Sequence, residues 1–192
     1  MKIPDLYEIR WHGRGGMGAV TAALIVADAL VRIGKYVQAI PEFGPERRGA
    51  PVKAYNRISS RPIRLRSGIT NPDMVVVIDA GFVTSPEILE GLEPNGVVLV
   101  NSALSPEELK EKIKLDGRKL WVVDASKIAL ESFGRNIPNT PMVGALSRVL
   151  GEMLPLEAVE EAIKERFSVK GEKVVEGNLT AIRRAYEEVK EA

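Results

Sequence analysis

A glycine-rich stretch near the N-terminus offers the clearest chemistry in this chain. Residues 13–18 read GRGGMG and contain Gly-x-Gly-x-x-Gly, the spacing of a dinucleotide-binding loop. Glycines that follow a strand let the backbone turn tightly, and the helix that begins after them directs unpaired N–H groups and positive potential at a phosphate. Arg14 adds a guanidinium, which pairs well with phosphate oxygens. The candidate anion-binding residues of this loop are Gly13, Arg14, Gly15, Gly16 and Gly18.

The loop by itself leaves its ligand open. A site for NAD requires an acidic residue at the end of the second strand, about 20 residues beyond the glycines, to hold the ribose hydroxyls. Asp28 falls inside the expected helix, and Glu42 leads directly into a second loop. A self-contained NAD(P)- or flavin-binding Rossmann protein therefore stays one alternative. The others are glycines that only let a helix pack closely on the sheet, and a loop that faces a cofactor held by a partner chain.

A second unusual segment, PEFGPERRGAP at residues 41–51, carries two adjacent arginines. Arg47 and Arg48 follow a strand and are expected on the same sheet edge as the glycine loop. Adjacent guanidinium groups bind phosphate or carboxylate groups, so both are candidate binding residues. The same charges would also suit a solvated loop or a subunit interface, and the local sequence does not choose between these uses.

The first forty residues predict a strand, a buried helix and a second strand. Residues 7–13 alternate as a strand does, and residues 17–33 are apolar on nearly every side, as in a buried helix. Gly34 ends that helix, and residues 35–40 return as a strand. This order is typical of an α/β protein, and it places the glycine loop between the first strand and its helix.

Three later apolar runs predict the centre of a parallel sheet. Residues 74–80, 97–101 and 120–125 are rich in valine and continuous rather than alternating, as in strands buried on both faces. Residues 52–59 and 62–67, on either side of a polar turn, predict an inserted β-hairpin. We therefore expect one α/β domain over residues 1–192, with an open, mostly parallel, doubly wound (Rossmann-like) sheet, the inserted hairpin and a helical C-terminal third.

The C-terminal third is expected to be helical from about residue 139. Asn139 or Thr140 is expected to cap one helix and Asn178 to cap the last, because such side chains accept hydrogen bonds from first-turn N–H groups. Asp79 and Asp124 end two of the buried strands, at the edge where open α/β sheets place their sites. We expect both carboxylates to orient loop backbone rather than to bind a ligand.

Composition limits the chemistry that this chain can carry alone. It has no cysteine, so it supplies no thiolate for an iron–sulfur cluster or a nucleophile, and its single histidine, His12, excludes a site of two imidazoles. A net charge of +1, from 27 basic and 26 acidic residues, argues against a general nucleic-acid surface. No apolar run has membrane-spanning length and the N-terminus lacks an apolar signal core, so we expect a cytoplasmic protein that does not enter membranes.

The glycine loop and the arginine segment together resemble a known family. HGRGGMGAVTAALIVADA at residues 12–29, followed by FGPERRGAPVKAYNRIS at 43–59, is similar to gamma subunits of the pyruvate:ferredoxin oxidoreductase and wider 2-oxoacid:ferredoxin oxidoreductase family. NPDMVVVIDA (71–80), GVVLVNS (96–102) and NTPMVGAL (139–146) agree in type and order. Because several ordered motifs match, the resemblance is much more specific than one glycine loop.

The resemblance implies a role within a larger enzyme. In that family the complex converts a 2-oxoacid and coenzyme A to acyl-CoA and carbon dioxide and reduces ferredoxin. Thiamine diphosphate and Mg²⁺ belong to the beta subunit and the [4Fe–4S] clusters to the delta subunit. This chain is therefore expected to have no cofactor, metal or catalytic residue of its own.

The same resemblance implies partners and a ligand. The expected partners are the alpha, beta and delta subunits, and the glycine loop, Arg47 and Arg48 would contact coenzyme A or a subunit interface. Pyruvate is the first choice of substrate, with 2-ketoisovalerate, 2-oxoglutarate and indolepyruvate as alternatives. An isolated chain would expose surfaces meant for its partners, so we expect it to form a homodimer or to remain a monomer that associates non-specifically.

Overall fold

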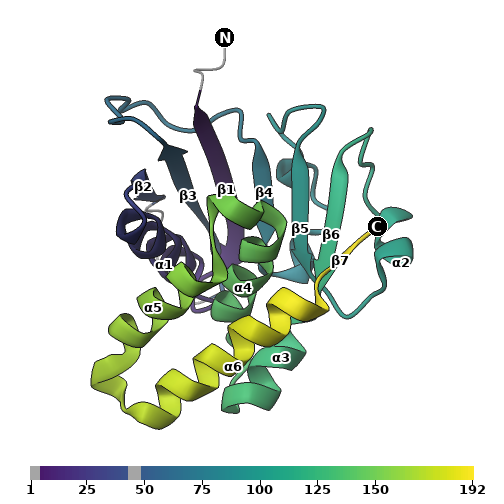
Figure 1. The fold of residues 1–192 in the computed structure, drawn as a ribbon. Helices are drawn as coiled ribbons and strands as arrows, with labels where there is room; N and C mark the ends of the chain where they lie inside the picture. Colours follow the sequence, from purple (N-terminus) through teal and green to yellow (C-terminus); the bar gives the residue numbers. More distant parts are fainter. Residues whose placement is uncertain (1–4, 43–48) are drawn as a thin grey trace.

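The computed structural model describes residues 5–42 and 49–192, and within them seven strands form one mixed sheet (Figure 1). The strands are β1 (Leu6–Arg14), β2 (Tyr36–Pro41), β3 (Pro51–Ser59), β4 (Met74–Val77), β5 (Val97–Asn101), β6 (Lys119–Val123) and β7 (Lys190–Glu191). Their order is β2-β3-β1-β4-β5-β6-β7. The central pairs β1–β4, β4–β5 and β5–β6 are parallel, whereas β3 and β7 run antiparallel to the strands beside them. The expected open, mostly parallel sheet is confirmed.

Helices cover the two faces of the sheet unequally. The helices are α1 (Ala19–Arg32), α2 (Pro106–Lys110), α3 (Ala125–Phe133), α4 (Asn139–Leu150), α5 (Leu156–Phe167) and α6 (Glu172–Glu188). All of them except α2 pack on one face, where they form the larger apolar core (Figure 1). The second face carries α2 and two short 3-10 turns, η1 (Ala80–Phe82) and η2 (Pro86–Ile88), over a smaller core.

The apolar pattern of the sequence explains these two cores. In β4, Met74 and Val76 face the larger core while Val75 and Val77 face the smaller one, so all four side chains are buried. This is why the run is continuous rather than alternating. Helix α1 buries seven side chains, five of them alanine or valine, so it can lie close to the sheet.

The inserted hairpin is real, but the sequence prediction chose the wrong pair of strands. β3 pairs with β2 on one edge, Tyr36 opposite Ser59, and with β1 on the other, Leu6 opposite Ser59. The predicted partner, residues 62–67, forms no strand. Its alternating pattern suits a strand, but both edges of β3 are already occupied.

Two predicted helix caps are also wrong. The residue before α4 is Pro138, which gives no side-chain cap, and Asn139 and Thr140 lie inside the first turn. Helix α6 begins at Glu172 behind Gly171, so Asn178 lies within the helix and is buried there. Helix α3 and the short strand β7 were not predicted. Asp124 was expected to orient loop backbone, and it instead caps α3, accepting a hydrogen bond from the Lys127 N–H at 3.0 Å.

Candidate functional site

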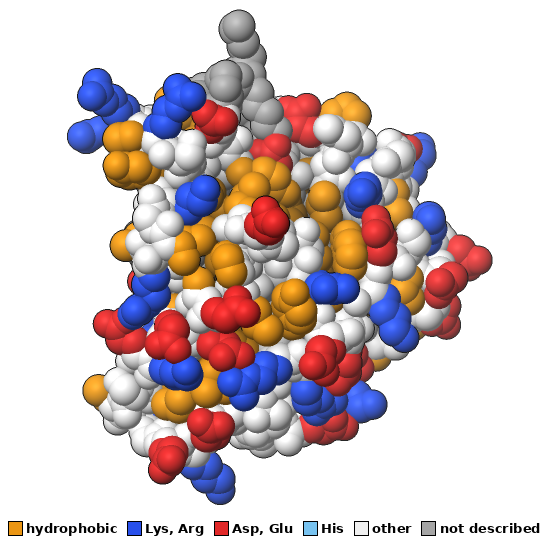
Figure 2. All heavy atoms as spheres, in the orientation of Figure 1, with side chains coloured by type: hydrophobic (Ala, Val, Ile, Leu, Met, Phe, Trp, Pro, Cys, Tyr) orange, Lys and Arg blue, Asp and Glu red, His pale blue; other side chains and the backbone are white. Residues whose placement is uncertain are grey.

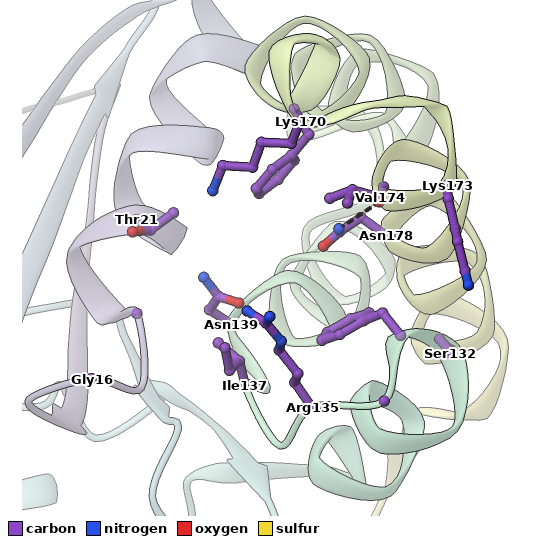
Figure 3. A pocket seen from close by; sticks show the side chains of 14 residues that line it. Gly16, Thr21, Ser132, Arg135, Ile137, Asn139, Lys170, Lys173, Val174 and Asn178 are labelled. Carbon is purple, nitrogen blue, oxygen red and sulfur yellow. Dashed lines mark hydrogen bonds between the residues drawn. The ribbon is translucent and has the colours of Figure 1, made fainter.

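A cavity of about 850 Å³ opens beside the glycine loop, between the N-terminus of α1 and helices α3, α4 and α6 (Figure 3). It lies beyond the carboxyl end of β1, where open α/β sheets hold their ligands. Glycine backbone and polar side chains line it at Gly16, Gly18, Thr21, Ser132, Gly134, Arg135, Asn139, Lys170, Lys173 and Asn178. Its apolar lining comprises Phe133, Ile137, Phe167 and Val174. The glycine loop, which the sequence singled out, therefore forms one wall of a substantial cavity.

Two glycines of the loop shape that wall. Gly18 is the N-cap of α1 in the left-handed conformation (φ 81°, ψ 27°), and no side chain caps the helix. A Cβ on Gly18 would lie 2.4 Å from Asn139 Nδ2. Gly16 also has a positive φ of +96°, with open space around it. The first-turn N–H groups of α1, which have no intrahelical acceptors, are therefore left beside the cavity.

The other loop residues anchor the backbone. A Cβ on Gly13 would lie 3.4 Å from Ala19 Cβ, so Gly13 lets α1 pack closely on β1. Gly15 donates its N–H to the Ala50 carbonyl at 2.9 Å and accepts from the Gly49 N–H at 3.1 Å. These bonds tie the glycine loop to the chain that enters β3.

Arg14 does not line the cavity. Its guanidinium forms a short ion pair with Asp79, lies 4.7 Å from the centroid of the Phe82 ring and donates to the Gly49 carbonyl at 3.2 Å. Asp79 also accepts the Gly81 N–H at 3.0 Å, so it orients loop backbone as expected. Arg47 and Arg48 lie outside the described residues.

A buried hydrogen-bond network forms the floor of the cavity. Thr140 Oγ1 donates to Asn178 Oδ1 at 2.8 Å, and Asn178 Nδ2 donates to the Val174 carbonyl at 2.8 Å. Asn139 Oδ1 accepts the Thr140 N–H at 2.9 Å. This network fixes α4 against α6 and leaves the Asn139 amide facing the cavity beside Gly18 (Figure 3).

Three basic side chains border the cavity, and sequence reasoning missed all of them. Lys170 extends its ammonium across the cavity toward Thr21, and the Arg135 guanidinium lies near Asn139 (Figure 3). Lys173 points along the outer rim. Lys170 also lies 5.2 Å from the centroid of the Phe167 ring. No local motif marks these residues, because the turn before α6 and the loop after α3 meet the glycine loop only through the fold.

On the opposite face of β1, His12 belongs to a buried polar cluster. Arg10 Nε donates to His12 Nε2 at 2.9 Å, and the Arg10 Nη2 group donates to three backbone carbonyls between residues 87 and 90. Burial, with the positive charges of Arg10 and Lys53, lowers the pKa of His12 to about 3. A neutral imidazole whose Nε2 is already an acceptor is a structural group here rather than a proton donor to the cavity.

Glu42, the acidic candidate for holding a ribose, is already engaged. It accepts a short hydrogen bond from the Tyr55 hydroxyl, and burial together with this bond raises the pKa of Tyr55. Glu42 is not among the residues that line the cavity. The arrangement therefore gives no support to an NAD site that uses Glu42.

Two other features of the described residues concern ligands and membranes. No group of three or more His, Cys, Asp or Glu side chains within residues 5–42 and 49–192 is arranged to hold a metal ion. In the same ranges, each helix is too short or too polar to cross a bilayer.

Comparison with known proteins gives a consistent set of relatives. The family model for pyruvate ferredoxin/flavodoxin oxidoreductase matches residues 8–188. The pyruvate synthase subunit PorC of Thermotoga maritima is 51% identical over 185 residues, covering 96% of this chain and 95% of that protein. The pyruvate/ketoisovalerate oxidoreductases common subunit gamma of Pyrococcus furiosus is 50% identical over 182 residues, covering 95% and 96%. A crystal structure of the pyruvate oxidoreductase subunit PORC from Thermotoga maritima matches with a TM-score of 0.86 at 47% identity, over 98% of this chain and 99% of that one.

Proposed function

Because this chain belongs to the pyruvate ferredoxin/flavodoxin oxidoreductase family, we propose that it is the gamma subunit of a multi-subunit 2-oxoacid:ferredoxin oxidoreductase that acts on pyruvate. The complex oxidatively decarboxylates the acid to acyl-CoA and passes the electrons to ferredoxin. Alpha, beta and delta subunits supply thiamine diphosphate, Mg²⁺ and the [4Fe–4S] clusters. The chain itself fits an accessory position, since it has no cysteine to ligate a cluster.

Within that complex, the cavity beside the glycine loop is proposed to bind the phosphates of coenzyme A. The observation that carries this proposal is the meeting of three anion-binding features in one cavity: the uncapped N-terminus of α1, the Lys170 ammonium and the Arg135 guanidinium. Helix N-termini and guanidinium groups both stabilise phosphate charge. The apolar lining, with Phe133 and Phe167, suits the flat adenine ring.

The proposal assigns the predicted loop residues different parts. Gly16 and Gly18 would let the backbone approach a phosphate, whereas Gly13 and Gly15 hold the loop in place. Arg14 would act indirectly, since its guanidinium is bound to Asp79. Arg47 and Arg48 stay proposed contacts to coenzyme A or to a partner subunit.

The assignment to a complex is tested by reconstitution. Alpha, beta and delta subunits are combined with and without this chain, and pyruvate- and coenzyme A-dependent ferredoxin reduction is followed. We expect activity and a stable four-subunit assembly only when the chain is present. Full activity in its absence, or a chain that stays separate in sedimentation velocity, would overturn the assignment.

The assignment of the cavity is tested by neutralising its basic groups in the complete complex. Lys170→Gln with Arg135→Gln removes two positive charges from the cavity, so the KM for coenzyme A should rise about 100- to 10,000-fold, because two hydrogen bonds to charged groups contribute about 3–6 kcal/mol. The KM for pyruvate should stay unchanged. Lys127→Gln with Arg148→Gln makes the same charge change outside the cavity and serves as the control. Equal KM values for coenzyme A in both double variants would refute the proposed site.

A further inference from the structure

A short arm of the chain, residues 62–67 (PIRLRS), has the pattern of a strand but pairs with no strand within residues 5–42 and 49–192. Ile63 and Leu65 are half-buried and alternate with exposed Arg64 and Arg66. No backbone N–H from residue 63 to residue 67 donates a hydrogen bond within the described part of the chain. Unpaired backbone groups along a strand-like segment are a template for pairing with another chain.

Two side chains of the sheet hold this arm in position. Gln38 Nε2 donates to the Leu65 carbonyl at 3.1 Å, and Arg57 Nη2 donates to the Ser67 carbonyl at 3.0 Å. Arg57 is 1% exposed and forms an ion pair with Glu8 at 2.6 Å, so it is a rigid anchor. In an extended chain, alternate peptide groups point to opposite sides. The carbonyls of Leu65 and Ser67 face the sheet, so an extended course through the arm would direct the backbone groups of Arg64 and Arg66 away from it.

The arm also carries charge that no residue in the described part of the chain neutralises. Arg61 pairs with Asp5 at 3.0 Å and Arg183 with Glu160 at 2.6 Å, but Arg64 and Arg66 form no ion pair with any described residue. Basic side chains gather at the corner of the molecule beside β2 and β3 (Figure 2). An open groove of about 820 Å³, lined by the arm and by β2 residues 38–40, lies alongside.

We propose that residues 62–67 pair as an edge strand with an extended, acidic segment of another subunit of the complex. Backbone groups spaced as in a strand select a polypeptide, because only another backbone presents matching donors and acceptors. The two unpaired arginines select acidic side chains on that segment. The inference rests on the proposed function, since it takes the partner from the same oxidoreductase.

The arm lies far from the proposed coenzyme A site. It follows the end of β3, where Ser59 is opposite Leu6 at the start of β1, whereas the cavity lies beyond the end of β1. The two sites are therefore at opposite ends of the sheet. Changes in the arm should weaken assembly while leaving the KM for coenzyme A of the assembled complex unaltered.

Hydrogen exchange measures the pairing directly. In the isolated chain the amides of residues 63–67 should exchange rapidly, because none donates a hydrogen bond to any residue that the structure describes. In the reconstituted complex the amides of Arg64 and Arg66 should exchange at least ~100-fold more slowly, since an amide in a ladder exchanges only when the pair opens. If the wild-type complex forms and these amides exchange as fast as in the isolated chain, the arm proposal is wrong and the proposed function stands.

Two sets of substitutions measure separately what the arginine charges and the backbone N–H groups of the arm contribute to assembly. Arg64→Glu with Arg66→Glu should raise the dissociation constant of this chain from the other subunits about 10- to 100-fold, and the control Lys127→Glu with Arg148→Glu should not. Arg66→Pro should weaken assembly about tenfold more than Arg66→Ala, because proline removes the N–H and cannot join a ladder.

Other outcomes also decide the matter. Protection of the arm in the isolated chain, together with a dimer in sedimentation, would replace the partner segment by a second copy and overturn the proposal. Equal affinities for the Arg66→Pro and Arg66→Ala variants would exclude strand pairing. Failure of the wild-type chain to assemble at all would remove the proposed function and this inference together.

Discussion

Replacing Gly18 with alanine should destabilise the fold more than the same change at Gly16, although both glycines have positive φ. The left-handed conformation costs a residue with a Cβ about 1–2 kcal/mol, and Gly16→Ala should cost only that, because nothing lies within 4 Å of the new Cβ. At Gly18 the Cβ would also meet Asn139 at 2.4 Å from Nδ2 and 2.8 Å from Cγ. Overpacking of this kind adds about 1–3 kcal/mol, so Gly18→Ala should cost about 2–5 kcal/mol in all.

The contact with Asn139 can be isolated by a double-mutant cycle. Asn139 is 7% exposed and its Oδ1 is bonded to the Thr140 N–H, so it cannot simply swing away. Asn139→Ala removes the clashing amide, so in the Gly18→Ala variant it should restore about 1–3 kcal/mol of the free energy of unfolding. This difference is the coupling energy between the two residues. Urea unfolding of all variants, followed by circular dichroism and tryptophan fluorescence, gives these values. Equal costs for the two glycine variants, or strictly additive effects of Gly18→Ala and Asn139→Ala, would refute the proposed geometry of the loop.

Three further substitutions test the contact between α4 and α6, the buried imidazole of His12 and the hydrogen bond between Trp11 and Asn56. Gly144→Ala in α4 should lower the free energy of unfolding by about 1–3 kcal/mol in urea, because its Cβ would lie 2.2 Å from the Ile182 carbonyl oxygen; a gain in stability would show that the two helices are not in such close contact. The pKa of His12 is lowered from 6.5 to about 3 in the fold, so the unfolded chain takes up this proton first and stability should fall as the pH drops from about 6.5 toward 3. His12→Gln should flatten that dependence in unfolding experiments, and an unchanged slope would argue against the buried neutral imidazole. Asn56→Leu should cost about 1–3 kcal/mol, since it leaves the buried Trp11 Nε1, now 2.8 Å from Asn56 Oδ1, without an acceptor; a stability equal to wild type would contradict that bond.

The central strands could be predicted from the sequence because the burial of each sheet face determines which positions along a strand are apolar. The valines of β4 face a core on each side, and the run is accordingly continuous. The hairpin was misplaced for the opposite reason. Residues 62–67 alternate as well as β3 does, but strand pairing depends on which edges are free, and β1 and β2 occupy both edges of β3.

The cavity was predictable only in part. The glycines predict a turn next to a helix N-terminus, and Gly18 is indeed the N-cap of α1. Lys170 and Arg135 come from segments more than a hundred residues away in the chain, and neither has a motif. Asn178 was expected to cap a helix because its side chain favours that position. Its side chain instead bonds the Val174 carbonyl one turn earlier in α6 and Thr140 of α4, and the Thr140 partner exists only after α4 and α6 have packed.

A structure of the reconstituted complex with coenzyme A bound would show whether the cavity of this chain holds the coenzyme A phosphates. We predict that a phosphate of coenzyme A lies in the cavity of this chain, within hydrogen-bond distance of the Lys170 ammonium and of N–H groups among Gly16 and residues 18–21. Coenzyme A held entirely by the other subunits, with this cavity filled by protein from a neighbouring chain, would contradict it.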